Sequence, residues 1–322
     1  MKFITQLFAI EKKPARGLQW FEWAMLAYLL LTTLLLLFTY TRLHNPQAML
    51  WGRLQALAIT LALWAVYCMV PCRLTMLARV AGQLALLGWW YPDTYEFNRM
   101  FPNLDHLFAA YEQQLFGCQP SLVLPQRFSH PVVSELLTLG YVSYYPMLVL
   151  VMLYYFIYRY KEYLQASFVM LASFFLFYVV FIALPVAGPQ YYFGAVGIDQ
   201  IAQGIFPDVG HYFEQHQEAL PSPGWKDGFF YKMLVEAHNA GERPTAAFPS
   251  SHVGVTVVLL WLAWQARSKR LFLTLLPLAV LMFFATFYLQ AHYVIDAIAG
   301  LFAGTLLYWL LRLLSQYLGH QK

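Results

Sequence analysis

Two ionisable residues stand out in the apolar C-terminal part of the chain. From Leu271 to Leu311 the only Asp, Glu, Lys, Arg or His residues are His292 and Asp296. They lie four residues apart, so on a helix they face the same way and the carboxylate can accept a hydrogen bond from the imidazole. An ionisable side chain at the centre of a membrane span costs at least about 2.5 kcal/mol, which favours a functional pair. The alternative is a pair that anchors a helix end at the membrane surface.

A second histidine, His252, precedes His292 by 40 residues. At 1.5 Å per residue, 40 helical residues span about 60 Å, which corresponds to two crossings of a hydrocarbon core about 30 Å thick. A basic stretch, Arg267-Ser268-Lys269-Arg270, lies between them, where a helical hairpin would reverse. We therefore expect both histidines at the same membrane face.

The residues before His252 are typical of a helix N-terminus. The stretch Pro249-Ser250-Ser251-His252 directly precedes an apolar segment, and proline suits the first turn because the missing N–H would be unpaired there. The free backbone N–H groups of Ser250, Ser251 and His252, with the helix dipole, predict an anion site. The alternative is an ordinary helix cap with nothing bound.

Positively charged residues precede this stretch. Arg243 is expected on the same side of the membrane, where a guanidinium can bind a phosphate bidentately. The alternative for Arg243 is an ion pair with Glu242 or Asp227. Lys226 and Lys232 are further candidates for a phosphate contact.

Two imidazoles, a carboxylate, an arginine and a helix N-terminus suit phosphoryl chemistry. One imidazole attacks phosphorus, the carboxylate orients it, and the other imidazole protonates the leaving oxygen. A competing interpretation is a metal site built from His252, His292 and Asp296. No other pair of histidines has three- or four-residue helical spacing, so we favour a site without metal and predict no cofactor.

The composition places the chain in a membrane. Hydrophobic residues make up 60% of the chain and charged residues 11%, against roughly 25% charged in soluble domains. So few charges cannot cover a soluble fold of this size, so lipid must be the solvent for most of it. The net charge of +4 is scattered and forms no basic run, which argues against a nucleic-acid partner.

A bilayer core needs about 20 apolar residues per helix, and this length predicts eight spans in an all-α polytopic fold. The spans are 18–40, 49–70, 74–90, 132–157, 163–186, 250–266, 271–290 and 293–314. Basic residues lie at alternate ends of these spans, so the positive-inside rule places both termini in the cytoplasm. The active site is then expected on the outer, periplasmic or lumenal, face.

Two long connections, 91–131 and 187–248, are expected on that outer face. The first carries apolar residues at helical spacing between polar ones, which predicts a helix lying in the interface. The second is rich in Gly, Pro and aromatic residues, and connections of this length usually have a function.

At the residues around the histidines the sequence resembles the type 2 phosphatidic acid phosphatase superfamily. The family pattern is Arg-Pro, then Pro-Ser-Gly-His, then Ser-Arg followed by His and Asp. The corresponding residues are Arg243-Pro244, Pro249-Ser250-Ser251-His252, and His292 with Asp296. The resemblance implies a six-helix core within 74–322, preceded by two extra helices within 1–73. It also implies a covalent phosphohistidine on His292, His252 as the leaving-group acid, and no metal.

Departures from the pattern favour one branch of the superfamily. Ala285 and Thr286 occupy the Ser-Arg positions, and Glu236 stands where a lysine is expected. These changes, with the upstream stretches 115–121 and 188–192, resemble the inositol phosphorylceramide synthases. On this resemblance Gln190 and Tyr191, within the second stretch, are candidates for substrate contact.

Three functions remain open on the sequence. The first is transfer of a phospho-head group, such as inositol phosphate, from a glycerophospholipid donor to a lipid alcohol such as ceramide. The second is a lipid phosphate or pyrophosphate phosphatase with the same residues and water as acceptor. The third is a proton-coupled transporter, in which His292 and Asp296 relay protons. The expected partners are the phospholipid donor and the lipid acceptor in the membrane, and the sequence does not identify a protein partner.

Overall fold

The computed structural model describes residues 2–239 and 241–320 of the chain, and within them the regular structure is helical throughout. Helices lie at all eight predicted spans, and their bounds are α2 (Trp20–Thr39), α3 (Pro46–Met69), α4 (Arg73–Asn98), α7 (Pro131–Val142) with α8 (Tyr144–Tyr158), α9 (Tyr160–Ala183), α13 (Ser251–Gln265), α14 (Lys269–Tyr288) and α15 (Val294–His320). The shorter elements are α1 (Lys2–Phe8), α5 (Asp105–Phe116), α6 (Pro120–Arg127), α10 (Pro189–Val196), α11 (Ile198–Ala202), η1 (Tyr212–Glu214) and α12 (Phe229–Asn239).

The chain is an all-α, multi-pass membrane protein. In its described part, α2, α3, α9, α14 and α15 are long and apolar enough to cross a bilayer, and the bent pair α7 and α8 makes a sixth candidate span. The other two predicted spans, which correspond to α13 and α4, are not among these candidates. Helix α13 has 15 residues, which at 1.5 Å each is shorter than the hydrocarbon core. Helix α4 carries the charged residues Arg79 and Asp93.

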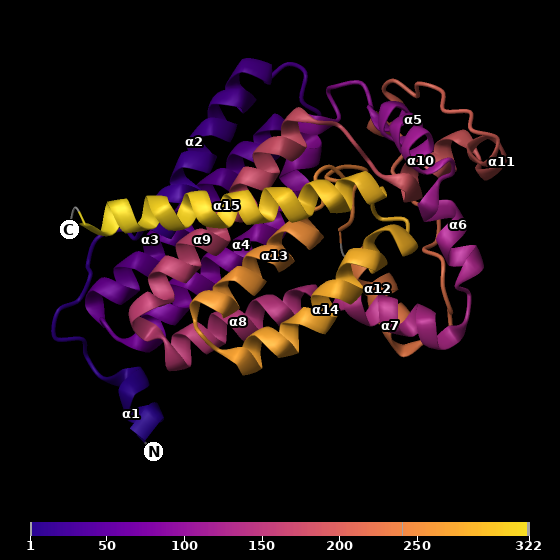
Figure 1. The fold of residues 1–322 in the computed structure, drawn as a ribbon. Helices are drawn as coiled ribbons and strands as arrows, with labels where there is room; N and C mark the ends of the chain where they lie inside the picture. The colour runs from indigo at the N-terminus through magenta and orange to yellow at the C-terminus, as the bar shows by residue number, and fades with distance from the viewer. Residues whose placement is uncertain (1, 240, 321–322) are drawn as a thin grey trace.

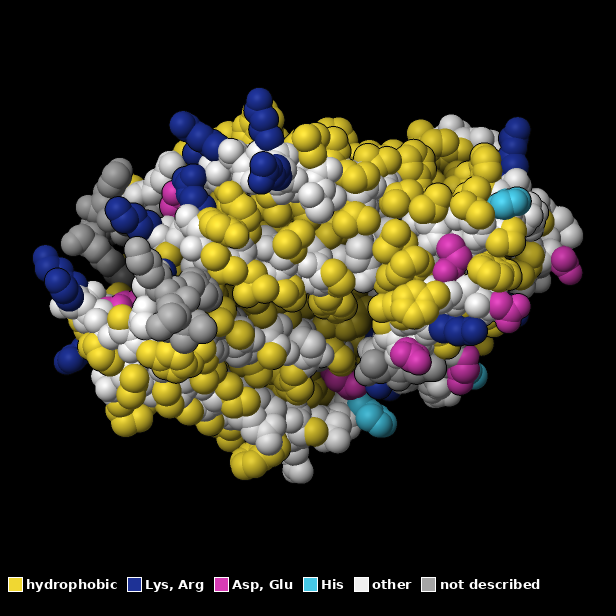
Figure 2. Space-filling view, turned by 90° about the horizontal axis from the view of Figure 1, so that it is seen from below, with side chains coloured by type: hydrophobic (Ala, Val, Ile, Leu, Met, Phe, Trp, Pro, Cys, Tyr) yellow, Lys and Arg dark blue, Asp and Glu magenta, His cyan; other side chains and the backbone are white. Residues whose placement is uncertain are grey.

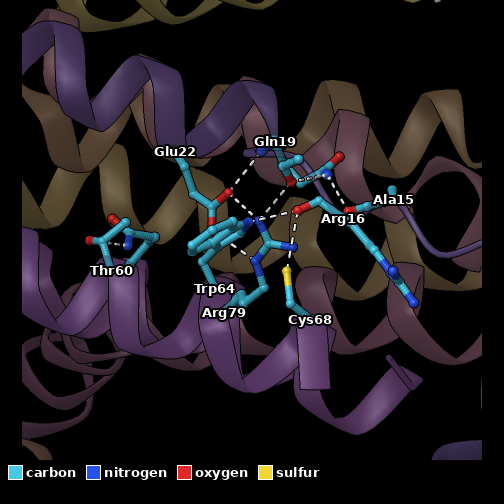
Figure 3. Close-up of polar contacts among 10 residues, drawn as sticks. Ala15, Arg16, Gln19, Glu22, Thr60, Trp64, Cys68 and Arg79 are labelled. Carbon is cyan, nitrogen blue, oxygen red and sulfur yellow. Dashed lines mark hydrogen bonds and ion pairs between the residues drawn. The ribbon is translucent and has the colours of Figure 1, made fainter. Parts of the chain in front are cut away.

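The charges of α4 are paired inside the helix bundle. Arg79 forms a buried ion pair with Glu22 of α2, donating to Oε1 at 2.8 Å and also to Oε2. Figure 3 shows this pair below the Gln19 backbone, whose N–H also donates to Glu22 at 2.7 Å. Arg53 of α3 binds both oxygens of Asp93, at 2.9 and 2.8 Å. Two buried ion pairs therefore fix α2 and α3 against α4.

The break between α7 and α8 bends the chain by 47°. Pro146 lies in the first turn of α8 and cannot donate to the carbonyl four residues earlier, so the helix of α7 cannot continue unbroken. The Ser143 hydroxyl donates to the Gly140 carbonyl at 2.7 Å at the break. This bend brings Tyr141 and Tyr144, one from each helix, to the same side chain, His252.

Close contact between α13 and α15 depends on three glycines. A Cβ at Gly304 would lie 2.1 Å from the Gly254 carbonyl oxygen, and one at Gly300 would lie 2.5 Å from the Ser250 carbonyl oxygen. Small residues four apart allow two membrane helices to approach backbone to backbone. The contact sets the start of α13, which carries His252, beside the first turns of α15.

The two ends of the molecule differ in structure and in charge. Helices α5, α6, α10 and α11 gather at the end of the bundle where α15 begins, whereas the C-terminus lies at the opposite end (Figure 1). On the face drawn in Figure 2, Lys and Arg gather at the end of the C-terminus and most Asp and Glu at the other, with apolar side chains between.

Candidate active site

His292 and His252 meet at one end of the bundle. The hairpin formed by α13 and α14 returns the chain to the level of His252, and Nε2 of His292 lies 3.5 Å from Nδ1 of His252. The expectation that the two histidines share one face therefore agrees with the geometry, and they also touch. In the described part of the chain no group of three His, Cys, Asp or Glu side chains is arranged to hold a metal ion.

The second ring nitrogen of His292 faces a backbone carbonyl. Nδ1 lies 2.7 Å from the Ala247 oxygen and 3.8 Å from Oδ2 of Asp296. A carbonyl oxygen only accepts, so Nδ1 carries the proton and Nε2 presents its lone pair toward His252. The expected hydrogen bond from imidazole to carboxylate is thus replaced by one to the backbone, with Asp296 at ion-pair distance.

Asp296 is fully buried and holds the turn that carries His292. Its Oδ2 accepts the Tyr293 N–H at 2.8 Å, and its backbone oxygen accepts the Ser250 N–H at 3.0 Å. Asp296 is therefore joined to the turn before α15 and to the start of α13. The carboxylate also stabilises the N-terminus of α15, where the helix dipole is positive.

The two histidines differ in their surroundings: burial lowers the pKa of His292, and two aromatic rings contact His252. The His292 side chain is buried, which lowers its pKa to about 4, although its hydrogen bond to Ala247 opposes this shift. The ring is therefore neutral at physiological pH and available as a nucleophile. The His252 ring stacks on Tyr141 and lies against Tyr144, each centroid being 4.6 Å away.

The serines before His252 form a helix cap. The Ser250 hydroxyl accepts the Val253 N–H at 3.4 Å, and the Ser250 N–H is donated to Asp296. The prediction that the Ser250 N–H is free for an anion is therefore wrong, because α15 supplies an acceptor that the sequence does not reveal. Ser251 and His252 are in the first turn of α13, where backbone N–H groups have no acceptor within the helix.

Sequence reasoning missed Asp105, which joins three segments around the site. Its carboxylate accepts the backbone N–H groups of Ala187 at 2.7 Å and Gly188 at 2.8 Å, and the Tyr293 hydroxyl at 3.0 Å. Burial raises the pKa of this carboxyl, while these hydrogen bonds oppose the shift. Asp105 therefore fixes the start of α5 beside the residue that follows His292.

Sequence reasoning also missed Glu112, two turns further along the same face of α5. Glu112 is fully buried, and its Oε1 accepts the Val294 N–H at 2.6 Å. The signal in the sequence is the spacing of Asp105 and Glu112, which are seven apart and so lie on one helix face. The sequence prediction for this segment rested instead on its apolar residues, which lie on another face of the helix.

Arg243 lines a pocket whose lining does not include His252 or His292. This pocket of about 560 Å³ has a polar lining, formed by His44, Glu96, Arg99, Glu214, Gln215, Gln217 and Arg243. Arg99 is bound to the Glu214 carbonyl at 2.7 Å, whereas Arg243 has no ion pair within the described residues. The alternative, an ion pair from Arg243 to Glu242 or Asp227, is therefore not formed among the described residues.

A partly buried polar pair, His238 and Glu242, lies between this pocket and His252. Glu242 Oε2 lies 3.0 Å from Nε2 of His238, and the side chain of Gln190 forms a hydrogen bond with Glu242. Burial raises the pKa of Glu242 to about 7 and lowers that of His238 to about 4. His238 in turn lies against Tyr141, the ring that stacks on His252.

The remaining candidates have varied positions. Tyr191 is buried and packs edge-on against Phe213. Lys226 and Lys232 are exposed, and the structure brings neither of them into contact with the two histidines. Thr286, at a position where the family pattern has arginine, is buried and donates to the Phe283 carbonyl at 2.8 Å.

The helical membrane fold and the adjacent His252 and His292 rings define a class, the multi-pass membrane enzymes of phosphate-ester chemistry. A family model described as the PAP2 superfamily matches residues 106–310, from α5 into α15. The chain belongs to this superfamily, which supports phosphatase or phosphotransferase activity on lipids in general. Comparison with the curated proteins and with the solved structures gives no match. Helices α2, α3 and α4 precede the matched region.

Proposed function

We propose that the chain is a membrane phosphotransferase that moves a phospho-head group from a glycerophospholipid to a lipid alcohol. The observation that carries the proposal is the state of His292. Its Nδ1 is held by the Ala247 carbonyl and its Nε2 faces His252 Nδ1 at 3.5 Å. One nitrogen is thus a fixed donor and the other a nucleophile with an acid beside it.

The reaction has two displacement steps. In the first, Nε2 of His292 attacks the donor phosphorus, the bond from phosphorus to the diacylglycerol oxygen breaks, and His252 gives that oxygen its proton. In the second, the acceptor hydroxyl attacks the phosphohistidine, its proton passes to His252, and the N–P bond breaks. Asp296 stabilises the positive charge that develops on the His292 ring, because its carboxylate lies 3.8 Å from Nδ1.

Two features support transfer over hydrolysis. The His292 side chain is buried and the His252 ring beside it lies against Tyr141 and Tyr144. This packing limits the access of water, and exclusion of water favours an alcohol as acceptor. The polar pocket of Arg243 and Arg99 also contains carboxylates and amides. Guanidinium groups bind phosphate and carboxylates accept from hydroxyls, so this lining suits a phosphorylated polyol head group such as inositol phosphate.

The orientation we propose places this site at the outer membrane face. The end with most Lys and Arg in Figure 2 is also the end of the C-terminus, which the positive-inside rule assigns to the cytoplasm. His252 and His292 lie at the opposite end.

The proposal is tested with purified protein in vesicles that contain a phosphoinositide labelled in its head group. With ceramide present we expect a labelled sphingolipid and stoichiometric diacylglycerol, and with His292→Gln neither. A labelled product that does not depend on ceramide, or release of free phosphate from phosphatidic acid at a higher rate, would favour a phosphatase. Arg243→Ala should raise KM for the phosphoinositide, whereas Lys232→Ala, on the exposed face of α12, should leave it unchanged.

A further inference from the structure

Helix α5 buries its acidic side chains and exposes large apolar ones, which is the reverse of an ordinary surface helix. Its buried residues are Asp105, Ala109 and Glu112, so both of its buried carboxylates face the protein. Four large apolar side chains are exposed instead, namely Leu107 at 44%, Tyr111 at 60%, Leu115 at 68% and Phe116 at 43%. A helix on a protein surface in water shows the reverse pattern.

The exposed side of α5 has the chemistry of a lipid contact. Helix α5 packs against α15, and the apolar side chains exposed in the first turns of α15 are Ile298, Leu301 and Phe302. Since α15 is apolar enough to cross a bilayer, these residues face lipid. The apolar side of α5 continues this lipid-facing surface beyond the end of the span. Helices with one apolar face commonly lie in the membrane interface.

The protein side of α5 completes the start of α15. The side chain of Tyr293, which precedes α15, is bound through its hydroxyl to Asp105 and does not cap the first free N–H groups of that helix. Glu112 supplies the cap, accepting the Val294 N–H at 2.6 Å and a second bond from Ile295. Two turns earlier in α5, Asp105 accepts the Tyr293 hydroxyl. The turn that carries His292 and Asp296 is therefore held from α5.

We propose that α5 lies on the outer-leaflet phospholipids through Leu107, Tyr111, Leu115 and Phe116, and that it fixes the His292–Asp296 turn through Glu112. Glu112 is a positioning residue that acts through the backbone of Val294, and does not touch substrate. Membrane contact and the geometry of the histidine pair are thus joined in one helix. The expected effect of Glu112 on the rate of transfer rests on the proposed phosphotransferase function. The lipid contact of α5 and its hydrogen bond to the turn do not.

The lipid contact is tested by fluorescence on the full chain in phosphatidylcholine nanodiscs. In a background that lacks Cys68, Cys72 and Cys118, a fluorophore is placed on Leu115→Cys and, as control, on the exposed Glu218→Cys. We expect the label at 115 to be quenched by nitroxide-labelled phospholipid and protected from iodide, and the label at 218 to show the reverse. Quenching by iodide at both positions would overturn the lipid contact.

The hold on the turn is tested by amide hydrogen exchange at Val294. Glu112→Ala should raise its exchange rate at least about tenfold, Glu112→Gln less because the amide oxygen still accepts, and the exposed control Gln114→Ala not at all. Leu115→Asp in nanodiscs should raise the same rate while the melting temperature stays within a few degrees. Unchanged exchange in Glu112→Ala would overturn the positioning role.

Kinetics then separate this inference from the proposed function. If wild-type protein transfers the head group, Glu112→Ala should lower kcat at least about tenfold with KM within about twofold, and Glu112→Asp should restore part of kcat. Equal loss in all Glu112 variants together with a matching fall in melting temperature would indicate a structural role alone. If the wild-type protein transfers nothing, the exchange and quenching results still decide the role of α5.

Discussion

The Ala247 carbonyl oxygen lies 2.7 Å from Nδ1 of His292, closer than the 3.8 Å that separates this nitrogen from Asp296. The backbone just before α13 therefore sets the tautomer of a ring that follows α14. The chain around Ala247 is itself fixed, because the Ala247 N–H donates to the Val186 carbonyl at 3.0 Å. Three segments distant in sequence, those of Val186, Ala247 and His292, thus determine which nitrogen of His292 is free.

This arrangement predicts unequal losses for His292 and Asp296 variants. His292→Gln removes the nucleophile, so transfer should fall below detection, at least about 10⁴-fold. Asp296→Asn keeps an acceptor for the Tyr293 N–H and leaves the Ala247 bond intact, so the loss should be about 10- to 100-fold. Steady-state kinetics on variants with matched melting temperatures measure both. Equal inactivation would show that the carboxylate, and not Ala247, orients the ring during reaction.

The low pKa of His292 predicts the acid limb of the pH–rate profile. Burial lowers this pKa to about 4, so the nucleophile stays neutral as pH falls through 6.5 and is protonated near pH 4. The acid limb of kcat/KM that reports His292 should therefore lie near pH 4. A limb centred near 6.5, the ordinary value for histidine, would contradict the assignment.

The same shift makes stability depend on pH. Between pH 6.5 and 4 the unfolded chain binds a proton at His292 that the folded chain does not, so the free energy of unfolding decreases as pH falls through this window. His292→Gln should reduce this slope. Melting curves of both proteins in detergent between pH 4 and 7 measure it, and parallel curves would oppose the prediction.

The glycine contact between α13 and α15 predicts a strict size limit. In Gly304→Ala the new Cβ would meet the Gly254 carbonyl at 2.1 Å, so the helices must separate, at a cost of about 1–3 kcal/mol. Because this contact places His252 beside α15, activity should fall with stability. Gly88→Ala is the matched control, since nothing lies within 4 Å of its Cβ and alanine favours the helix by about 0.5–1 kcal/mol.

The ion pair of Arg79 with Glu22 predicts a double-mutant result. Arg79→Ala leaves a carboxylate buried without its partner, which should destabilise by about 3–5 kcal/mol, whereas replacement of both residues by leucine should recover most of this loss. The half-exposed pair of Arg159 and Glu162 is the control, worth about 0–1 kcal/mol. If Arg79→Ala unfolds no more easily than the control, the pair contributes little to holding α2.

The sequence by itself determined the class of fold and the chemical type of the site. Eight apolar segments predicted eight helical regions because lipid requires backbone groups to be satisfied within each span. The rarity of ionisable residues between Leu271 and Leu311 singled out His292 and Asp296, and the distance to His252 matched an out-and-back hairpin. These inferences need only composition, periodicity and length, which are local properties of the chain.

The tertiary structure decided which groups touch. The sequence pointed to Asp296 as the partner of His292, but a carbonyl 45 residues earlier takes the shorter contact. Glu112 reaches Val294 across 182 residues, and Arg243 lines a pocket apart from the histidines. Such contacts depend on how helices pack, because hydrogen bonds to backbone atoms carry no side-chain signature. The sequence therefore indicated the type of chemistry. Helix packing determined which nitrogen of His292 carries the proton and placed α5 against the turn that carries His292.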